Sequence, residues 1–134
     1  MVKSRKQQIL LAQYFFDKGC DQWYAGEYND ALQEFAKALV LRESLLGKYH
    51  SQTSRTYFSM GCALHGKGDY HDALIALRRT MRIATVKPDK ANKLQGAKDY
   101  ICWVLKKAGK NDKDVATYQE QLTQAIDHEM KGDK

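Results

Sequence analysis

The 134-residue sequence contains a single proline, Pro88. Because proline interrupts helices, its scarcity leaves room for long uninterrupted ones. Residues that favour helices, such as Ala, Leu, Lys, Gln and Glu, recur along the whole chain. These two features predict an all-α protein.

The sequence also has no pattern of cysteines that would cross-link it. Its three cysteines are an odd number, lie far apart and form no CxxC motif. This spacing excludes a disulfide framework and the usual zinc-binding patterns. We therefore expect a reducing compartment and a cytoplasmic protein, with no metal and no other cofactor.

Long apolar runs are missing as well. No run approaches the ~20 residues that span a bilayer, and the apolar patch at residues 9–12 is too short for the core of a secretory signal. Hydrophobic residues nevertheless make up 43% of the chain, well above the level of disordered proteins. The composition predicts one folded domain over residues 1–134.

The net charge of +6 is concentrated in the middle of the chain. Residues 73–113 carry eleven Lys or Arg against three Asp or Glu, whereas residues 1–72 carry nine against eight. Such a segment can attract an acidic peptide, a nucleic acid or a membrane surface, or it can be a solvated outer face. No recognised nucleic-acid motif accompanies it, so nucleic acid and membrane are the less favoured partners.

A repeat with a period of 42 residues is the main signal in the sequence. The segment GEYNDAL at residues 26–32 recurs as GDYHDAL at residues 68–74, with five of seven positions identical. The match extends upstream, where Gly19 and Gly61 each precede the segment by seven residues. A duplicated structural unit explains this similarity.

Each unit is predicted to be a helical hairpin. Gly26 and Gly68 would end a first helix, because glycine accepts the left-handed backbone of a C-terminal cap. Apolar residues then recur at steps of three and four, which indicates a second helix. Gly19 and Gly61 are expected where the two helices cross, since small residues allow close approach.

This pattern resembles the tetratricopeptide repeat. The residues that carry the resemblance are Gly19, Gly26, Tyr28, Ala31 and Phe35 in the first unit and Gly61, Gly68, Tyr70, Ala73 and Leu77 in the second. The long period and the Leu-Gly-x-x-His connector at residues 46–50 are similar to kinesin light chain-type repeats. Tyr49 and Ser51 replace the Asp and Pro that usually flank the histidine of that subtype.

A third, degenerate unit is predicted from spacing. Gly109 follows Gly68 by 41 residues, and apolar residues at helical spacing lie on both sides of it, at Ile101, Leu105, Val115, Tyr118, Leu122 and Ile126. The expected fold is a right-handed solenoid of about three helical hairpins, or six helices, with units at approximately residues 8–46, 51–87 and 92–130.

The resemblance implies a protein-binding module, in which the first helix of each unit lines a concave groove. The groove positions include Phe16 and Trp23 in the first unit, Arg55, Phe58, Ser59 and His65 in the second, and Tyr100, Trp103, Lys106 and Lys107 in the third. Aromatic side chains beside cations favour an acidic peptide with a bulky apolar anchor. The alternative is that these aromatics pack between units.

Two further functional interpretations remain open. One end of the stack can be incompletely capped and bury itself against another copy, which would make the chain a self-associating structural protein. The basic residues 73–113 can instead bind anionic surfaces. No Ser/His/Asp arrangement or paired-carboxylate cleft is visible, so no enzymatic activity is predicted. The Lys and Asn residues that grip chaperone tails are replaced here by Phe16, Cys20 and Ser59.

Overall fold

The computed structural model describes residues 3–86, 99–100, 102–103, 105–107, 109, 111, 113–114, 116–117, 120–121 and 124. Four complete helices lie in this part: α1 (Arg5–Tyr24), α2 (Tyr28–Leu46), α3 (Ser51–Lys67) and α4 (Tyr70–Val86). The described residues contain no strand. The predicted all-α class is confirmed.

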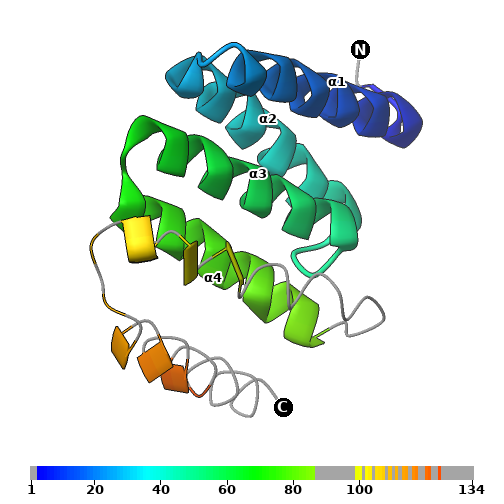
Figure 1. Cartoon of the computed structure of the whole chain (residues 1–134). Helices are drawn as coiled ribbons and strands as arrows, with labels where there is room; N and C mark the ends of the chain where they lie inside the picture. The colour runs from blue at the N-terminus through cyan, green and yellow to red at the C-terminus, as the bar shows by residue number, and fades with distance from the viewer. Residues whose placement is uncertain are drawn as a thin grey trace.

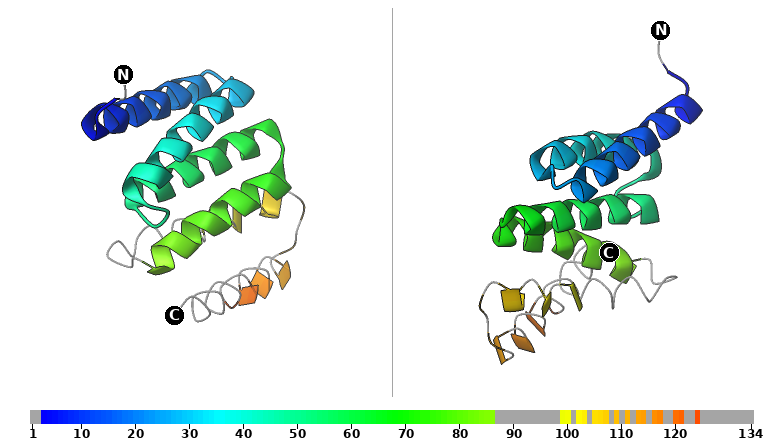
Figure 2. Two further views of the ribbon diagram at one scale, coloured as in Figure 1. Left: turned by 180° about the vertical axis from the view of Figure 1, so that it is seen from behind. Right: turned by 45° about the horizontal axis from the view of Figure 1, so that its top comes forward.

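The helices form two hairpins that stack side by side (Figure 1). α1 packs against α2 and α3 against α4, and the two hairpins meet mainly through α2 and α3. Two further views show the same layered order (Figure 2). This arrangement confirms the predicted stack of helical hairpins.

Glycines end the first helix of each unit, as predicted. Gly26 and Gly68 have φ angles of 78° and 94°, in the left-handed region. Gly109, the glycine of the predicted third turn, has a φ of 87°, and helical residues are described before it, at 105–107, and after it, at 113–114. Its φ therefore lies in the same left-handed region. The proposed third-unit residues Ile101, Val115, Tyr118, Leu122 and Ile126, like residues 87–98, lie outside the described residues.

The hairpin crossings lie where the sequence placed them. A Cβ atom built on Gly19 would lie 2.7 Å from the Phe35 ring and 3.2 Å from the Ala31 carbonyl oxygen. At Gly61 the corresponding distance to Leu77 is 3.0 Å. The absence of a side chain at each glycine lets the two helices of a hairpin touch.

The connector between the hairpins is short and hydrogen-bonded. α2 ends at Leu46 with Gly47 as its C-cap, and His50 caps the start of α3 by accepting a hydrogen bond at Nδ1 from the Gln52 amide, 3.1 Å away. The Thr53 hydroxyl donates to the Gly47 carbonyl over 2.9 Å. The histidine of the connector therefore has a structural role.

One buried cation joins three helices, and sequence reasoning missed it. The guanidinium of Arg42 in α2 donates to Gln13 Oε1 of α1 and to Thr56 Oγ1 of α3, both at 2.9 Å. It also lies 4.5 Å above the Phe16 ring. Burial lowers the pKa of Arg42, because the charged form loses its hydration, and nearby Arg55 lowers it further.

Tyr57 provides a pH-sensitive contact between α3 and α2. Its hydroxyl donates a 2.6 Å hydrogen bond to Glu43 Oε1. Burial, this hydrogen bond and the Glu43 charge raise the pKa of Tyr57 from 10.0 to about 12. Since the folded state favours the protonated phenol, the stabilisation is complete below pH 10 and is lost as the pH rises through about 12.

Tyr57→Phe is therefore expected to remove the fall in the free energy of unfolding that ionisation of the Tyr57 phenol causes at alkaline pH. The variant should cost about 1 kcal/mol at neutral pH, since the hydrogen bond to Glu43 is gone. Urea unfolding at several pH values between 9.0 and about 12 would measure both effects. The exposed Tyr14→Phe variant is the control and should behave like the parent chain. An unchanged pH dependence in Tyr57→Phe would contradict the assignment.

Candidate functional site

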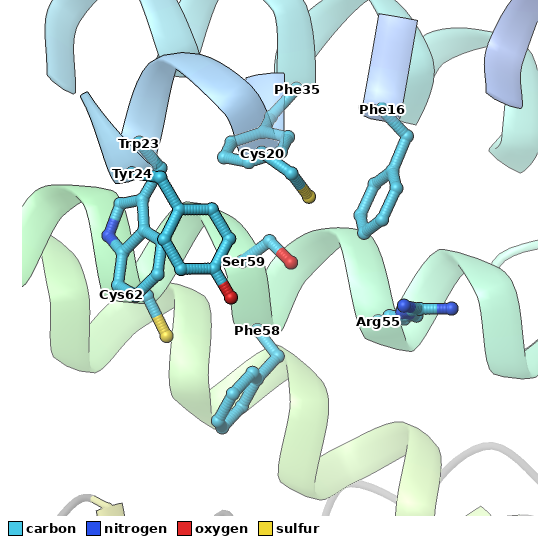
Figure 3. A pocket seen from close by; sticks show the side chains of 9 residues that line it. All are labelled: Phe16, Cys20, Trp23, Tyr24, Phe35, Arg55, Phe58, Ser59 and Cys62. Atoms are coloured by element: carbon cyan, nitrogen blue, oxygen red, sulfur yellow. The ribbon is translucent and has the colours of Figure 1, made fainter. Parts of the chain in front are cut away.

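A pocket opens between α1 and α3, with a volume of about 280 Å³. Figure 3 shows side chains of α1 on one side and side chains of α3 on the other. Its lining residues are Phe16, Cys20, Trp23, Tyr24, Phe35, Arg55, Phe58, Ser59 and Cys62. The pocket therefore lies between the first helices of two successive units.

Aromatic rings form most of the pocket wall. Trp23 and Tyr24 make an edge-to-face contact with ring centroids 4.9 Å apart, and Tyr24 is 82% exposed. Phe58 is half-buried on the α3 side. Rings of this kind offer a large apolar surface to a ligand at little entropic cost. The pocket is suited to an apolar side chain.

The charges around the pocket differ between its two sides. On α3, exposed Arg55 places its guanidinium 5.1 Å from the centroid of the Phe16 ring. On α1, Asp17 and Asp21 are near enough to influence the thiol of Cys20. Among the lining residues, Arg55 is the charged one, so a ligand meets a cation on the α3 side.

The two pocket cysteines are free and neutral. Burial raises the pKa of the Cys20 thiol and that of the Cys62 thiol. Both are free thiols, as the sequence predicted. A neutral buried thiol behaves as a small apolar group and is a poor nucleophile. Among the described residues, no three His, Cys, Asp or Glu side chains gather in a way that could hold a metal ion.

A second group of rings joins α3 to described residues of the predicted third unit. His65 lies 4.3 Å from Trp103 and 5.2 Å from Tyr70, and Phe58 lies 5.3 Å from Tyr100, measured between ring centroids. Burial lowers the pKa of His65, and the positive charge of Lys107 lowers it further. These rings pack between units, which is the alternative that the sequence left open for them.

The structure separates the predicted groove residues into pocket residues, residues of the inter-unit ring cluster, and two exposed lysines beside that cluster. Trp23, Arg55, Phe58 and Ser59 share the pocket. His65, Tyr100 and Trp103 belong to the inter-unit ring cluster, beside which exposed Lys107 lies 5.8 Å from the Trp103 ring. Lys106 is exposed on the same segment.

Phe16 belongs to the core more than to the surface. It is only 2% exposed and packs with Phe35, Ala31 and Ala63 in a cluster that joins α1, α2 and α3. Sequence reasoning omitted two pocket residues, Tyr24 and Phe35. Tyr24 directly follows the groove residue Trp23 in the sequence. This adjacency could have predicted that Tyr24 lies at the groove.

No helix in the described part of the chain has the length and apolar character needed to cross a membrane. Neither the curated proteins nor the solved structures gave a significant match to this chain. The profile of the tetratricopeptide repeat matches residues 19–85, which is half of the sequence and includes both hairpin turns. With two stacked helical hairpins, glycines at the turns and small residues at the crossings, the chain belongs to the tetratricopeptide repeat family, whose repeats generally mediate protein–protein interactions.

Proposed function

We propose that the chain binds an extended segment of another protein. One bulky apolar side chain of that segment occupies the pocket between α1 and α3, and a neighbouring carboxylate pairs with Arg55. The observation that carries the proposal is the pocket itself, which is lined by aromatic rings and edged by an exposed guanidinium.

The chemistry of the pocket suits both the apolar side chain and the neighbouring carboxylate of the proposed ligand. A volume of about 280 Å³ leaves room for one large side chain, and burying an aromatic ring removes 150–250 Å² of surface from water, by a rough general estimate. Arginine pairs with carboxylates through two parallel hydrogen bonds, so Arg55 would select an acidic neighbour and fix its orientation.

A fluorescence titration tests the proposal directly. The chain has two tryptophans, so Trp103→Phe leaves Trp23 in the pocket wall as the sole reporter. The probe is a synthetic acidic peptide with one central phenylalanine. Replacing that phenylalanine with alanine, or making Phe58→Ala in the chain, should weaken binding about tenfold or more. Arg55→Glu should weaken it about tenfold.

The matched control is Arg78→Glu, which makes the same charge change on the exposed surface of α4, away from the pocket lining. It should leave the affinity nearly unchanged. Equal losses in Arg78→Glu and Arg55→Glu, with a steep salt dependence, would favour the anionic-surface function instead. A double variant, Lys106→Glu with Lys107→Glu, asks whether the acidic part of the ligand extends to the third unit.

We also propose that the repeats belong to the kinesin light chain-like subtype. Support comes from the 42-residue period, the 19 residues of α2 and the capping role of His50 in the connector.

A further inference from the structure

A histidine lies at the centre of the interface between α3 and the described residues of the predicted third unit. The His65 ring centroid is 4.3 Å from that of Trp103 and 5.9 Å from that of Tyr100. On its other side, His65 contacts Tyr70 at the start of α4, with the centroids 5.2 Å apart. His65 therefore packs against rings from two neighbouring elements, and it is the titratable side chain that joins them.

One ring nitrogen of His65 is buried without a hydrogen bond. No donor or acceptor among the described residues lies within bonding distance of its Nε2 atom. The neutral ring can keep its lone pair at this nitrogen and carry its proton at Nδ1. Protonation places an N–H group and a positive charge at the buried atom, where neither has a partner. A buried unpaired charge is far more costly than a buried lone pair.

The charges around His65 also oppose its protonation. Burial lowers the pKa of His65 below its ordinary value of 6.5, and the positive charge of Lys107 lowers it further. The groups that face it from α4 and from the third unit, Tyr70 and Tyr100, are uncharged phenols at neutral pH. Asp69, the nearest carboxylate along the chain, lies 3.2 Å from the Lys67 ammonium.

The aromatic face of Trp103 does not compensate for this repulsion. Aromatic rings attract cations, and an imidazolium at residue 65 would lie beside the Trp103 ring. The Lys107 ammonium already lies 5.8 Å from the centroid of the same ring. A second cation would therefore share one ring with the first, and the two charges would repel each other.

We propose that His65 is a proton switch for the docking of the third unit on α3, in which the neutral ring holds Tyr100 and Trp103 in place and the imidazolium releases them. Each unit of a solenoid contacts only its neighbours, so this interface can open while the first two hairpins stay folded. No ligand takes part, so the switch does not depend on the proposed peptide binding.

The direction of the pH effect follows from the two states of the ring. A released His65 has its ordinary pKa of 6.5, whereas the docked ring has a lower pKa. Docking is therefore at full strength above pH 6.5 and weakens as the pH falls below that value. Between about pH 7.5 and about pH 5 the docking constant should fall, by at most about thirtyfold.

Two single-tryptophan chains separate release of the third unit from unfolding of the whole protein. Trp23→Phe leaves Trp103 to report on the interface, and Trp103→Phe leaves Trp23 to report on the first hairpin. Urea unfolding is followed by fluorescence at about pH 7.5 and about pH 5. The Trp103 midpoint should fall at the lower pH, and the Trp23 midpoint should change much less. Equal shifts in the two chains would overturn the proposal of a local release.

Substitutions in the Trp23→Phe chain test the histidine itself. His65→Phe keeps an aromatic ring but cannot be protonated, so it should remove most of the pH dependence of the Trp103 midpoint. His65→Gln should do the same, and it guards against a gain in packing from the phenylalanine. His71→Gln, at an exposed histidine of α4, is the matched control and should behave like the parent. A pH dependence that survives in both residue 65 variants would overturn the proposal.

Reversing the charge that faces His65 tests the mechanism. Lys107→Glu places a carboxylate near the ring and favours the imidazolium, so this variant should lose less docking strength at about pH 5 than the parent. Lys106→Glu makes the same charge change one residue earlier and should have a smaller effect. Equal effects of the two variants would show that overall charge sets the pH dependence, which would overturn the assignment to His65 and Lys107.

Discussion

Gly19→Val is expected to destabilise the protein by about 3 kcal/mol, although valine has the better helix propensity. Replacing a glycine inside a helix ordinarily stabilises it, by about 1 kcal/mol for alanine and less for valine. Here even the first added carbon would lie 2.7 Å from two atoms of the Phe35 ring. Either that ring moves out of the core or α1 separates from α2, and each result costs more than the propensity gains.

Urea unfolding of Gly19→Val measures this effect. Ser44→Val places the same side chain at an exposed position of α2 and should change the free energy of unfolding by less than about 0.5 kcal/mol. Gly61→Val should be milder than Gly19→Val, since the nearest atoms belong to the more adaptable Leu77 side chain at 3.0 Å. A Gly19→Val protein as stable as the parent chain would show that the hairpin crossing is looser than described.

Phe35→Ala is expected to have the largest effect, a loss of about 3–5 kcal/mol in the free energy of unfolding. Phe35 is 1% exposed, and its ring centroid lies 5.6 Å from that of Phe16. Its removal leaves a cavity at the point where α1, α2 and α3 meet, because the surrounding backbone can collapse only partly. Since domains of this kind are stable by roughly 5–15 kcal/mol, the variant should be near its unfolding threshold.

Val40→Ala is the matched control for Phe35→Ala, because it also truncates an apolar residue of α2 but at a site that is 69% exposed. Its cost should stay below about 0.5 kcal/mol. Thermal and urea unfolding of both variants would give the comparison. Similar losses in the two variants would mean that the core of the first hairpin is not where the structure places it.

The repeat and its turns could be predicted because they are local in the chain. A glycine with positive φ and apolar residues at steps of three and four act within one or two turns of helix. The turns at Gly26 and Gly68 and the crossings at Gly19 and Gly61 were therefore predicted correctly.

The burial of individual groove residues could not be predicted in the same way. Phe16 and Phe58 occupy equivalent positions in the two units and both line the pocket, yet Phe16 is buried and Phe58 only half-buried. The difference arises because Arg42 from α2 and Arg55 from α3 both stack on Phe16. The spacing of residues within one helix does not predict which side chains of two other helices will pack against it.

The sequence by itself determined the helices, their turns and the order of the hairpins, since each depends on residues close together in the chain. Only the tertiary structure decided that Arg42 would join three helices and that Trp23 and Phe58 would border one pocket. The physical reason is that burial is a property of neighbours brought from distant segments, and stacking decides which faces meet and which remain in water.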